Sequence, residues 1–378
     1  MPKVKNWQIE REMNYPYPDK RPKKQIAYIF DTNKCIACQT CTMACKTTWT
    51  AGKGQEYVFW NNVESKPWGY YPLGWDVQIL NLLGAQKWNG EAYAGKTIFE
   101  AGSKPEEILG YMPDERDYAS PNLGEDECKD IIIDVEDHYI KGPVHNNWGF
   151  YLARICNHCT YPACVAACPR KAIYKREEDG IVLIDQKRCR GYRECVRACP
   201  YKKPFYNNTT RVSEKCIACY PKIENGEMPQ CVTTCIGKIR LQGFKSRPDK
   251  VRKNNPMDYL IHVKKIALPL YPQLGTEPNV YYIPPVHVDQ RFLKQMFGPG
   301  ADKSVQLYRN AIKDKELIGA LTLFGCTQGI VDTYRVEGDH AIGFDEKGKE
   351  IVNVPLIEPV FVRPAKIEAT GAYLYNNT

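Results

Sequence analysis

The chain has 378 residues, 43% of them hydrophobic and 25% charged, which is the balance of a folded protein of two or three domains. Lysine and arginine outnumber aspartate and glutamate only by 52 to 44, and the excess is spread along the chain, which argues against a nucleic-acid-binding protein. No stretch contains the roughly 18 consecutive apolar residues that span a bilayer, so we expect no direct membrane span.

Residues 1–25 form a polar arm with neither the apolar core of a secretory signal nor an Arg-Arg pair. We therefore expect one of two locations. Either the folded protein is exported, to the periplasm or an equivalent compartment, by a partner that carries the signal, or it stays at the cytoplasmic face of the membrane.

A first cysteine group, DTNKCIACQTCTMACK, follows the arm, and residues 51–150 then form an insertion with Cys128 as their one cysteine. Glycine and proline mark the turns of this insertion, and the run DIIIDVEDHYI at 130–140 predicts a β-strand. It is rich in aromatic residues, namely Tyr57, Phe59, Trp60, Trp68, Tyr70, Tyr71, Trp75, Trp88 and Tyr93.

The other cysteine groups lie within 156–235. Between the second and third groups, KAIYKREEDGIVLID predicts a β-hairpin with its turn at Asp179 and Gly180. Residues 241–378 have no ligand spacing and predict an extended, proline-broken segment with one amphipathic helix at 302–325. We expect this tail to pack against the protein and to contact a partner.

Fifteen of the seventeen cysteines fall in four tight groups, an odd number for disulfides, which in any case belong to small secreted chains. The groups are Cys35, Cys38, Cys41, Cys45 (C-x2-C-x2-C-x3-C); Cys156, Cys159, Cys164, Cys168 (C-x2-C-x4-C-x3-C); Cys189, Cys195, Cys199 (C-x5-C-x3-C); and Cys216, Cys219, Cys231, Cys235 (C-x2-C-x11-C-x3-C).

This spacing is typical of iron–sulfur clusters. Closely spaced cysteines on one loop reach the irons of one cube, and the last cysteine, often before proline, ligates the other cluster of a pair. Pro169 and Pro200 stand at those positions. Zinc is the competing interpretation, and the fourth group alone would suit it, but the repeated x3-C ending has no role at a tetrahedral zinc.

The third group departs from the pattern at Tyr192, which stands where a cysteine is expected. A phenol is a poor ligand for cluster iron, so we predict a [3Fe–4S] cluster there. The alternative is a cubane with tyrosine or water at the fourth iron. Three [4Fe–4S] clusters and one [3Fe–4S] cluster need fifteen thiolates, which is the number of grouped cysteines.

The hairpin between groups two and three suggests that they form one pair, which leaves groups one and four as the other. The expected ligand sets are then Cys35, Cys38, Cys41 and Cys235 (site I), Cys45, Cys216, Cys219 and Cys231 (site II), Cys156, Cys159, Cys164 and Cys199 (site III), and Cys168, Cys189 and Cys195 (site IV, three-iron).

Cations beside the groups are expected to stabilise the anionic clusters, although most are individually better explained as solvated surface charge. They are Lys34, Lys46, Arg154, Arg170, Arg188, Arg190, Arg193, Arg197 and Lys215. His158 is expected to be structural rather than a ligand, and Cys128 and Cys326 to be buried small apolar groups. Since the sequence lacks a dinucleotide loop, a P-loop and a C-x-x-C-H haem motif, we predict electron transfer without catalytic residues.

Four ferredoxin-like groups, with an aromatic residue for one cysteine of the third, resemble the beta subunits of molybdopterin oxidoreductases of the dimethyl sulfoxide reductase superfamily. The run KCIACQTCTMACKTTWTAGKGQEYVFWNNVESKPWGYYP resembles the subgroup of nitrate, perchlorate and selenate reductases, ethylbenzene dehydrogenase and nitrite oxidoreductase. The opening NWQIEREMNYPY is most similar to nitrite oxidoreductase beta.

The resemblance implies an α+β fold with two ferredoxin-like two-cluster modules, 26–50 plus 207–240 and 151–206. It also implies an alpha subunit with molybdenum bis-pterin and a haem-bearing gamma subunit or cytochrome. Nitrite oxidation to nitrate is the implied reaction, and a reductase or an ethylbenzene-type dehydrogenase is the alternative.

A free-standing polyferredoxin is the alternative from another class, and it would elute alone in gel filtration. The aromatic insertion and the tail argue against it, because a shuttle needs little beyond its cluster cores.

Overall fold

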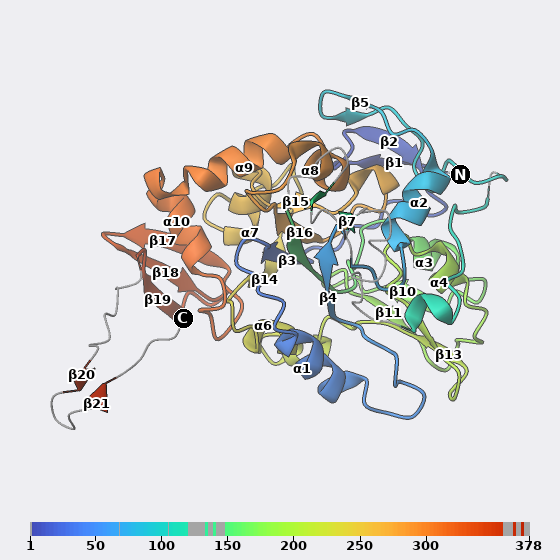
Figure 1. The fold of residues 1–378 in the computed structure, drawn as a ribbon, viewed down its shortest axis with the longest axis horizontal. Coiled ribbons are helices and arrows are strands. Elements are labelled where there is room, and N and C mark those ends of the chain that lie inside the picture. The colour runs from blue at the N-terminus through green and yellow to red at the C-terminus, as the bar shows by residue number, and fades with distance from the viewer. Residues whose placement is uncertain are drawn as a thin grey trace.

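The computed structural model (Figure 1) describes residues 2–67, 69–104, 106–119, 133–134, 139–140, 148–357, 366–367 and 372–373. These residues form a mixed α/β fold of small sheets and short helices around one central sheet. Cys128 and Trp68 lie outside the described residues, as does most of the strand predicted at 130–140. Within that run, β7 (Ile133–Asp134) and β8 (Tyr139–Ile140) pair antiparallel.

The amino-terminal half contains β1 (Lys3–Asn6), β2 (Arg11–Asn14), β3 (Gln25–Asp31), α1 (Thr40–Trp49), β4 (Asn62–Lys66), α2 (Trp75–Leu83), β5 (Trp88–Asn89), β6 (Ala92–Tyr93), the 3₁₀ helix η1 (Arg116–Tyr118), β9 (Phe150–Arg154), α3 (Ala163–Ala166), β10 (Ile173–Lys175) and β11 (Val182–Ile184). Next come α4 (Glu194–Ala198), β12 (Phe205–Asn207), β13 (Val212–Glu214), α5 (Tyr220–Glu224), α6 (Gln230–Thr233) and β14 (Arg240–Lys245).

The carboxyl-terminal part contains α7 (Pro256–Asp258), the π-helix η3 (Tyr259–Val263), β15 (Leu268–Pro269), η4 (Pro272–Leu274), β16 (Val280–Ile283), α8 (Gln290–Phe297), α9 (Ala301–Arg309), η5 (Ala311–Lys313), α10 (Lys315–Thr322), β17 (Thr333–Glu337), β18 (His340–Phe344), β19 (Glu350–Pro355), β20 (Lys366–Ile367) and β21 (Ala372–Tyr373). Strands β17, β18 and β19 form a three-stranded sheet against α10, at the left of Figure 1.

Strand β3 is the centre of the main sheet, whose order is β14–β3–β16–β15. It pairs antiparallel with β14 and parallel with β16. All seven of its residues are buried because side chains alternate between two cores. Tyr28 and Phe30 face the core that holds the cysteines, whereas Ala27 and Ile29 face the core built by the carboxyl-terminal part.

The carboxyl-terminal residues therefore complete the sheet that carries the cysteine loops. The first group follows β3 directly, and the fourth group ends just before β14. Packing against the protein, as expected for the tail, is confirmed for residues 256–283 by the second core and by the pairing of β16 with β3.

Two local predictions have clear outcomes. The hairpin at Asp179 and Gly180 is confirmed, since β10 and β11 pair antiparallel on either side of it. The single helix at 302–325 is wrong: α9 ends at Arg309 and α10 begins at Lys315. Asp314 causes the break, because its carboxylate accepts a hydrogen bond from the Leu317 amide (3.1 Å) and starts a new helix.

A buried charge network joins the aromatic insertion to the cysteine-bearing core. Glu64 on β4 is fully buried and accepts hydrogen bonds from the Tyr71 amide (3.0 Å), Trp75 Nε1 (3.1 Å) and Arg154 on β9. Burial raises the pKa of Glu64, but Arg154 and Lys66 together hold this pKa below its usual range.

Replacing Glu64 with glutamine is expected to destabilise the fold by about 3–5 kcal/mol, because Arg154 would become an uncompensated buried cation, whereas Lys66 keeps its ion pair with Asp76 (3.0 Å). Thermal unfolding of the anaerobic protein measures this. Glu12→Gln, an exposed carboxylate on β2, is the matched control and should change stability by less than about 0.5 kcal/mol. Equal midpoints for the two variants would show that the network contributes no stability.

Candidate iron–sulfur cluster sites

The structure gathers the four expected cysteine sets as follows. The cysteines of sites II, III and IV each line a cavity of their own. In site I, burial, and to a lesser degree the Cys41 and Cys235 thiolates, raise the pKa of Cys35 to about 11, which places these three together. Cys38 follows on the same loop and is exposed.

Short helices give one cysteine to each of two neighbouring sites. Helix α1 carries Cys41 for site I and Cys45 for site II, one turn apart. Helix α3 carries Cys164 for site III, and Cys168 for site IV follows it. Helix α4 carries Cys195 for site IV and is followed by Cys199 for site III, and α6 carries Cys231 for site II and is followed by Cys235 for site I. The helices pack as pairs, α1 with α6 and α3 with α4.

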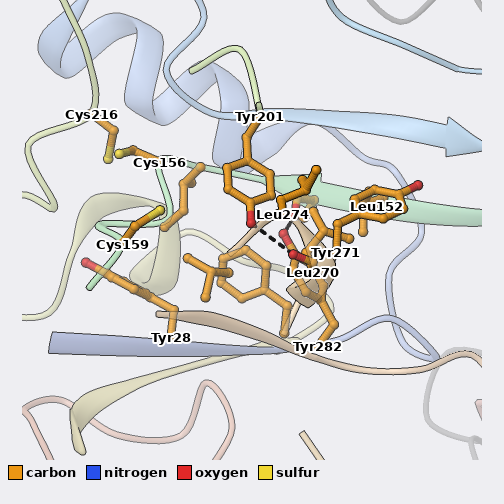
Figure 2. Close-up of a cluster of buried hydrophobic side chains, with 14 of the residues drawn as sticks. Tyr28, Leu152, Cys156, Cys159, Tyr201, Cys216, Leu270, Tyr271, Leu274 and Tyr282 are labelled. Atoms are coloured by element: carbon orange, nitrogen blue, oxygen red, sulfur yellow. Dashed lines mark hydrogen bonds between the residues drawn. The ribbon is translucent and has the colours of Figure 1, made fainter. Parts of the chain in front are cut away.

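Electrostatic interactions between cysteines indicate which sites are neighbours. Cys41 is among the thiolates that raise the pKa of Cys231, so site I adjoins site II. Burial, followed by the Cys156 thiolate, raises the pKa of Cys216 to about 12, and Figure 2 shows these two cysteines next to each other. Sites II and III therefore adjoin.

Site IV adjoins site III, because Cys199 is among the groups that raise the pKa of Cys195. The four sites thus form a series from I to IV. All four cysteines of site II are buried, whereas site I contains the exposed Cys38 and two cysteines of site IV are half-buried. The ends of the series lie nearest the surface.

The cysteine loops share a backbone conformation that locates Tyr192. The residue before the second cysteine is left-handed in sites I, III and II: Ala37 (φ 53°), His158 (φ 41°) and Ala218 (φ 54°). Gly191 (φ 67°) holds the same position immediately before Tyr192. Such turns direct successive amides inward, as in anion-binding nests.

The match between site I and site IV extends further. Gln39 and Arg193, the residues after Cys38 and Tyr192, are also left-handed and precede α1 and α4. Tyr192 therefore occupies the backbone position of a second cysteine. Its side chain lines the site IV cavity and is 61% exposed, so the ring lies at the mouth of the site.

A second repeat follows the last cysteine of three groups. Lys171, Lys202 and Lys238 are each left-handed, and their amides donate to the carbonyl of the cysteine three residues earlier (3.1–3.2 Å). The next amide then donates to the cysteine sulfur, from Ala172 to Cys168 (3.3 Å) and from Ile239 to Cys235 (3.4 Å). Amide donors to cluster sulfur raise the reduction potential.

Buried polar atoms without hydrogen-bond partners surround these cavities. Trp60 Nε1 and Asn61 Nδ2 lie at site II, His158 Nε2 at site III and Ser213 Oγ at site IV. Unpaired buried donors are rare in proteins. Thiolate and sulfide sulfur atoms of an iron–sulfur cluster accept such hydrogen bonds, so the residues present fit clusters at these sites.

Arg240 contacts a site cysteine directly, and it was not among the cations predicted from the sequence. It is fully buried at the start of β14, donates from Nη2 to Cys41 Sγ (3.1 Å) and stacks over the Phe30 ring (4.3 Å). Burial lowers the pKa of Arg240, but the Cys41 and Cys231 thiolates outweigh burial and raise this pKa above its usual value. Its position five residues after the last cysteine, on a strand that returns to site I, was the available signal.

The predicted cations divide into three kinds. Arg154 and Lys215 are buried, and Lys215 Nζ donates to the Cys216 carbonyl (2.7 Å). Three arginines line the site IV cavity, namely Arg170, Arg190 and Arg193. The others make local contacts or lie in solvent: Lys34 with Asp31, Lys46 with loop carbonyls, Arg197 with Glu194, and Arg188 exposed. Buried Lys202 and Lys203 were not predicted.

His158 has a structural role in the loop of site III. Its Nδ1 accepts a hydrogen bond from the Val182 amide (3.1 Å), and burial lowers its pKa, so the ring is neutral with its hydrogen on Nε2. Cys326 is half-buried and packs against the second core.

Two features are absent from the described residues. No three His, Cys, Asp or Glu side chains among them lie close enough to hold a single metal ion. Within the same residues, no helix has the length and apolar character needed to cross a membrane.

Comparison with known proteins adds the family context. Residues 147–245 match the "4Fe-4S dicluster domain". The chain is 45% identical to the selenate reductase subunit beta of Thauera selenatis, over 75% of this chain and 89% of that one. It is 44% identical to the chlorate reductase subunit beta of Ideonella dechloratans, with the same coverage. It is 42% identical to the respiratory nitrate reductase subunit beta of Haloferax mediterranei, over 72% and 82% of the two chains.

Proposed function

Since the chain belongs to the iron–sulfur beta subunits of dimethyl sulfoxide reductase-family molybdoenzymes, we propose that it conducts electrons through three [4Fe–4S] clusters and one [3Fe–4S] cluster. The observation that carries this proposal is the series of sites I to IV, in which α1 and α6 join sites I and II, α3 and α4 join sites III and IV, and Cys216 lies beside Cys156 between sites II and III. The clusters supply one-electron transfer. The polypeptide supplies thiolates, hydrogen bonds and insulation from water.

The proposal assigns the cysteines as two ferredoxin-like modules. Residues 26–50 and 207–240 hold sites I and II, and residues 151–206 hold sites III and IV. The packing of α1 on α6 and of α3 on α4 supports this division. The insertion 51–150 and the region 241–378 are then the added parts that support the modules and contact partner subunits.

The proposed partners are a molybdopterin alpha subunit at one end and a haem-bearing gamma subunit or cytochrome at the other. We assign the complex to nitrite oxidation, from the likeness of NWQIEREMNYPY to nitrite oxidoreductase beta subunits. Selenate, chlorate or nitrate reduction is the competing assignment, favoured by the names of the relatives. We further propose export of the folded complex with the alpha subunit.

Iron analysis and EPR of the anaerobically purified chain test the cluster content. The expected result is about 15 irons per chain and an isotropic three-iron signal after oxidation. A colourless, zinc-containing protein would exclude electron transfer altogether. A brown protein with about 16 irons and no three-iron signal would place a fourth cubane at site IV.

Assays of the purified complex test the reaction. We expect nitrite-dependent reduction of an artificial electron acceptor. A complex that reduces selenate or chlorate with reduced viologen, and does not oxidise nitrite, would remove the nitrite assignment while leaving the electron-transfer role intact.

A further inference from the structure

A cavity of about 300 Å³ is lined in part by residues of the β1–β2 hairpin, the β5 turn and the junction of α8 and α9. These elements lie in the upper part of Figure 1. None of its lining residues is a cysteine, so it is distinct from sites I to IV. Its walls include the aromatic rings of Trp7, Trp88, Tyr281 and Phe297. This volume is at the lower end of that of small-molecule sites.

Lys245, the last residue of β14, lines this cavity and is only 5% exposed. Its ammonium group forms no hydrogen bond or ion pair with any described residue, and the centroid of the Tyr281 ring lies 5.8 Å from Nζ. Buried charges in proteins are almost always paired. An unpaired ammonium beside an open cavity therefore indicates a missing anionic partner.

The one acidic side chain buried in the cavity wall does not fill this role. Glu277 accepts hydrogen bonds from Arg21 (2.5 and 3.0 Å) and from the Trp7 amide (3.1 Å). Its charge is thus already compensated by Arg21, and it forms no ion pair with Lys245 within the described structure.

Two further features of the same cavity suit an anion. His262 lines it, and its buried Nε2 has no hydrogen-bond partner. The segment Gly298–Gly300 also lines it, directly before α9, a nine-residue helix whose Gly300 N-cap provides no side-chain cap. The amino terminus of a helix carries partial positive charge and unpaired amides.

We propose that this cavity binds a carboxylate, with Lys245 as its counter-ion. One buried cation beside Glu277 favours a single negative charge over a phosphate or a dicarboxylate. The aromatic walls favour a flat or apolar body attached to the carboxylate. The group could belong to a free small organic acid or to an acidic side chain of a partner subunit, and the two sources are separated by experiment.

Calorimetric titration of the purified complex with benzoate tests the free-acid source. We expect binding that weakens at least tenfold in Lys245→Met and stays within twofold in Lys303→Met, an exposed lysine lining the same cavity. Unchanged EPR signals in both variants will show that the fold and the clusters are intact. Benzoate binding that is equal in wild type and Lys245→Met would overturn the proposal.

Amine labelling followed by mass spectrometry tests the partner source. If the complex does not bind benzoate, the proposal requires that Lys245 is labelled in the chain expressed alone and protected in the complex, while Lys303 serves as the internal control. Absence of benzoate binding together with any other labelling pattern for Lys245 would overturn the proposal. Neither result bears on electron transfer.

Discussion

Replacing Tyr192 with cysteine is expected to remove the isotropic three-iron EPR signal and to raise the iron content from about 15 to about 16 atoms per chain. Tyr192 has the backbone position that Cys38 has in site I, between left-handed Gly191 and Arg193. A cysteine there would present a thiolate to the open corner of the site IV cluster. The measurement is EPR of the oxidised and the dithionite-reduced protein.

Tyr174→Cys is the matched control, because Tyr174 is also exposed (46%) but lies on β10 and does not line site IV. The three-iron signal should be unchanged in this variant. If the signal also persists in Tyr192→Cys, the alignment of the third cysteine group with the first is wrong.

Replacing Lys203 with methionine is expected to lower the midpoint potentials of the clusters at sites II and III. Lys203 is buried, lines the site III cavity and donates to Asn62 Oδ1 (2.6 Å). Burial and Arg154 lower its pKa to about 7, and the negative charge of Cys216 and Cys156 opposes that shift. Anionic clusters on both sides therefore favour the charged ammonium.

Unit charges about 8 Å apart, at an effective dielectric constant of about 20, interact by roughly 2 kcal/mol. For a one-electron couple this corresponds to a shift of roughly 90 mV. EPR-monitored redox titration measures the shift. Lys203→Arg keeps the positive charge, so its cluster potentials should stay close to those of the wild type. Exposed Lys187→Met should cause no shift in potential. Equal shifts at sites I and IV would show a general structural disturbance instead.

The four cysteine loops were predictable from the sequence because ligand spacing within a loop is a local property. The grouping of Cys45 with Cys216, Cys219 and Cys231 around one cavity joins two loops that are distant in the chain, so spacing within a loop does not determine it. The hairpin at Asp179 and Gly180 was equally local, since turn chemistry and strand alternation lie within twelve residues.

Features that depend on distant pairing were not predictable. Arg240 reaches Cys41 only because β14 pairs with β3, and no local sequence pattern indicates that these two strands pair. The buried ion pair of Glu64 with Arg154 could not be predicted, because it forms only when β4 pairs with β9. A lysine three residues after Cys168, Cys199 and Cys235 was visible in the sequence. Its role in the turn became clear only from the left-handed backbone of these lysines.

The early position of β3 in the chain also determines when the central sheet and site I can be completed during synthesis. Its partners β14 and β16 follow it by more than two hundred residues, and Cys235 of site I is equally distant from Cys35. A ribosome that adds about 5–20 residues per second leaves the first cysteine loop without these partners for on the order of ten seconds or longer. The complete ligand set proposed for site I can therefore assemble only after more than half of the chain has been synthesised.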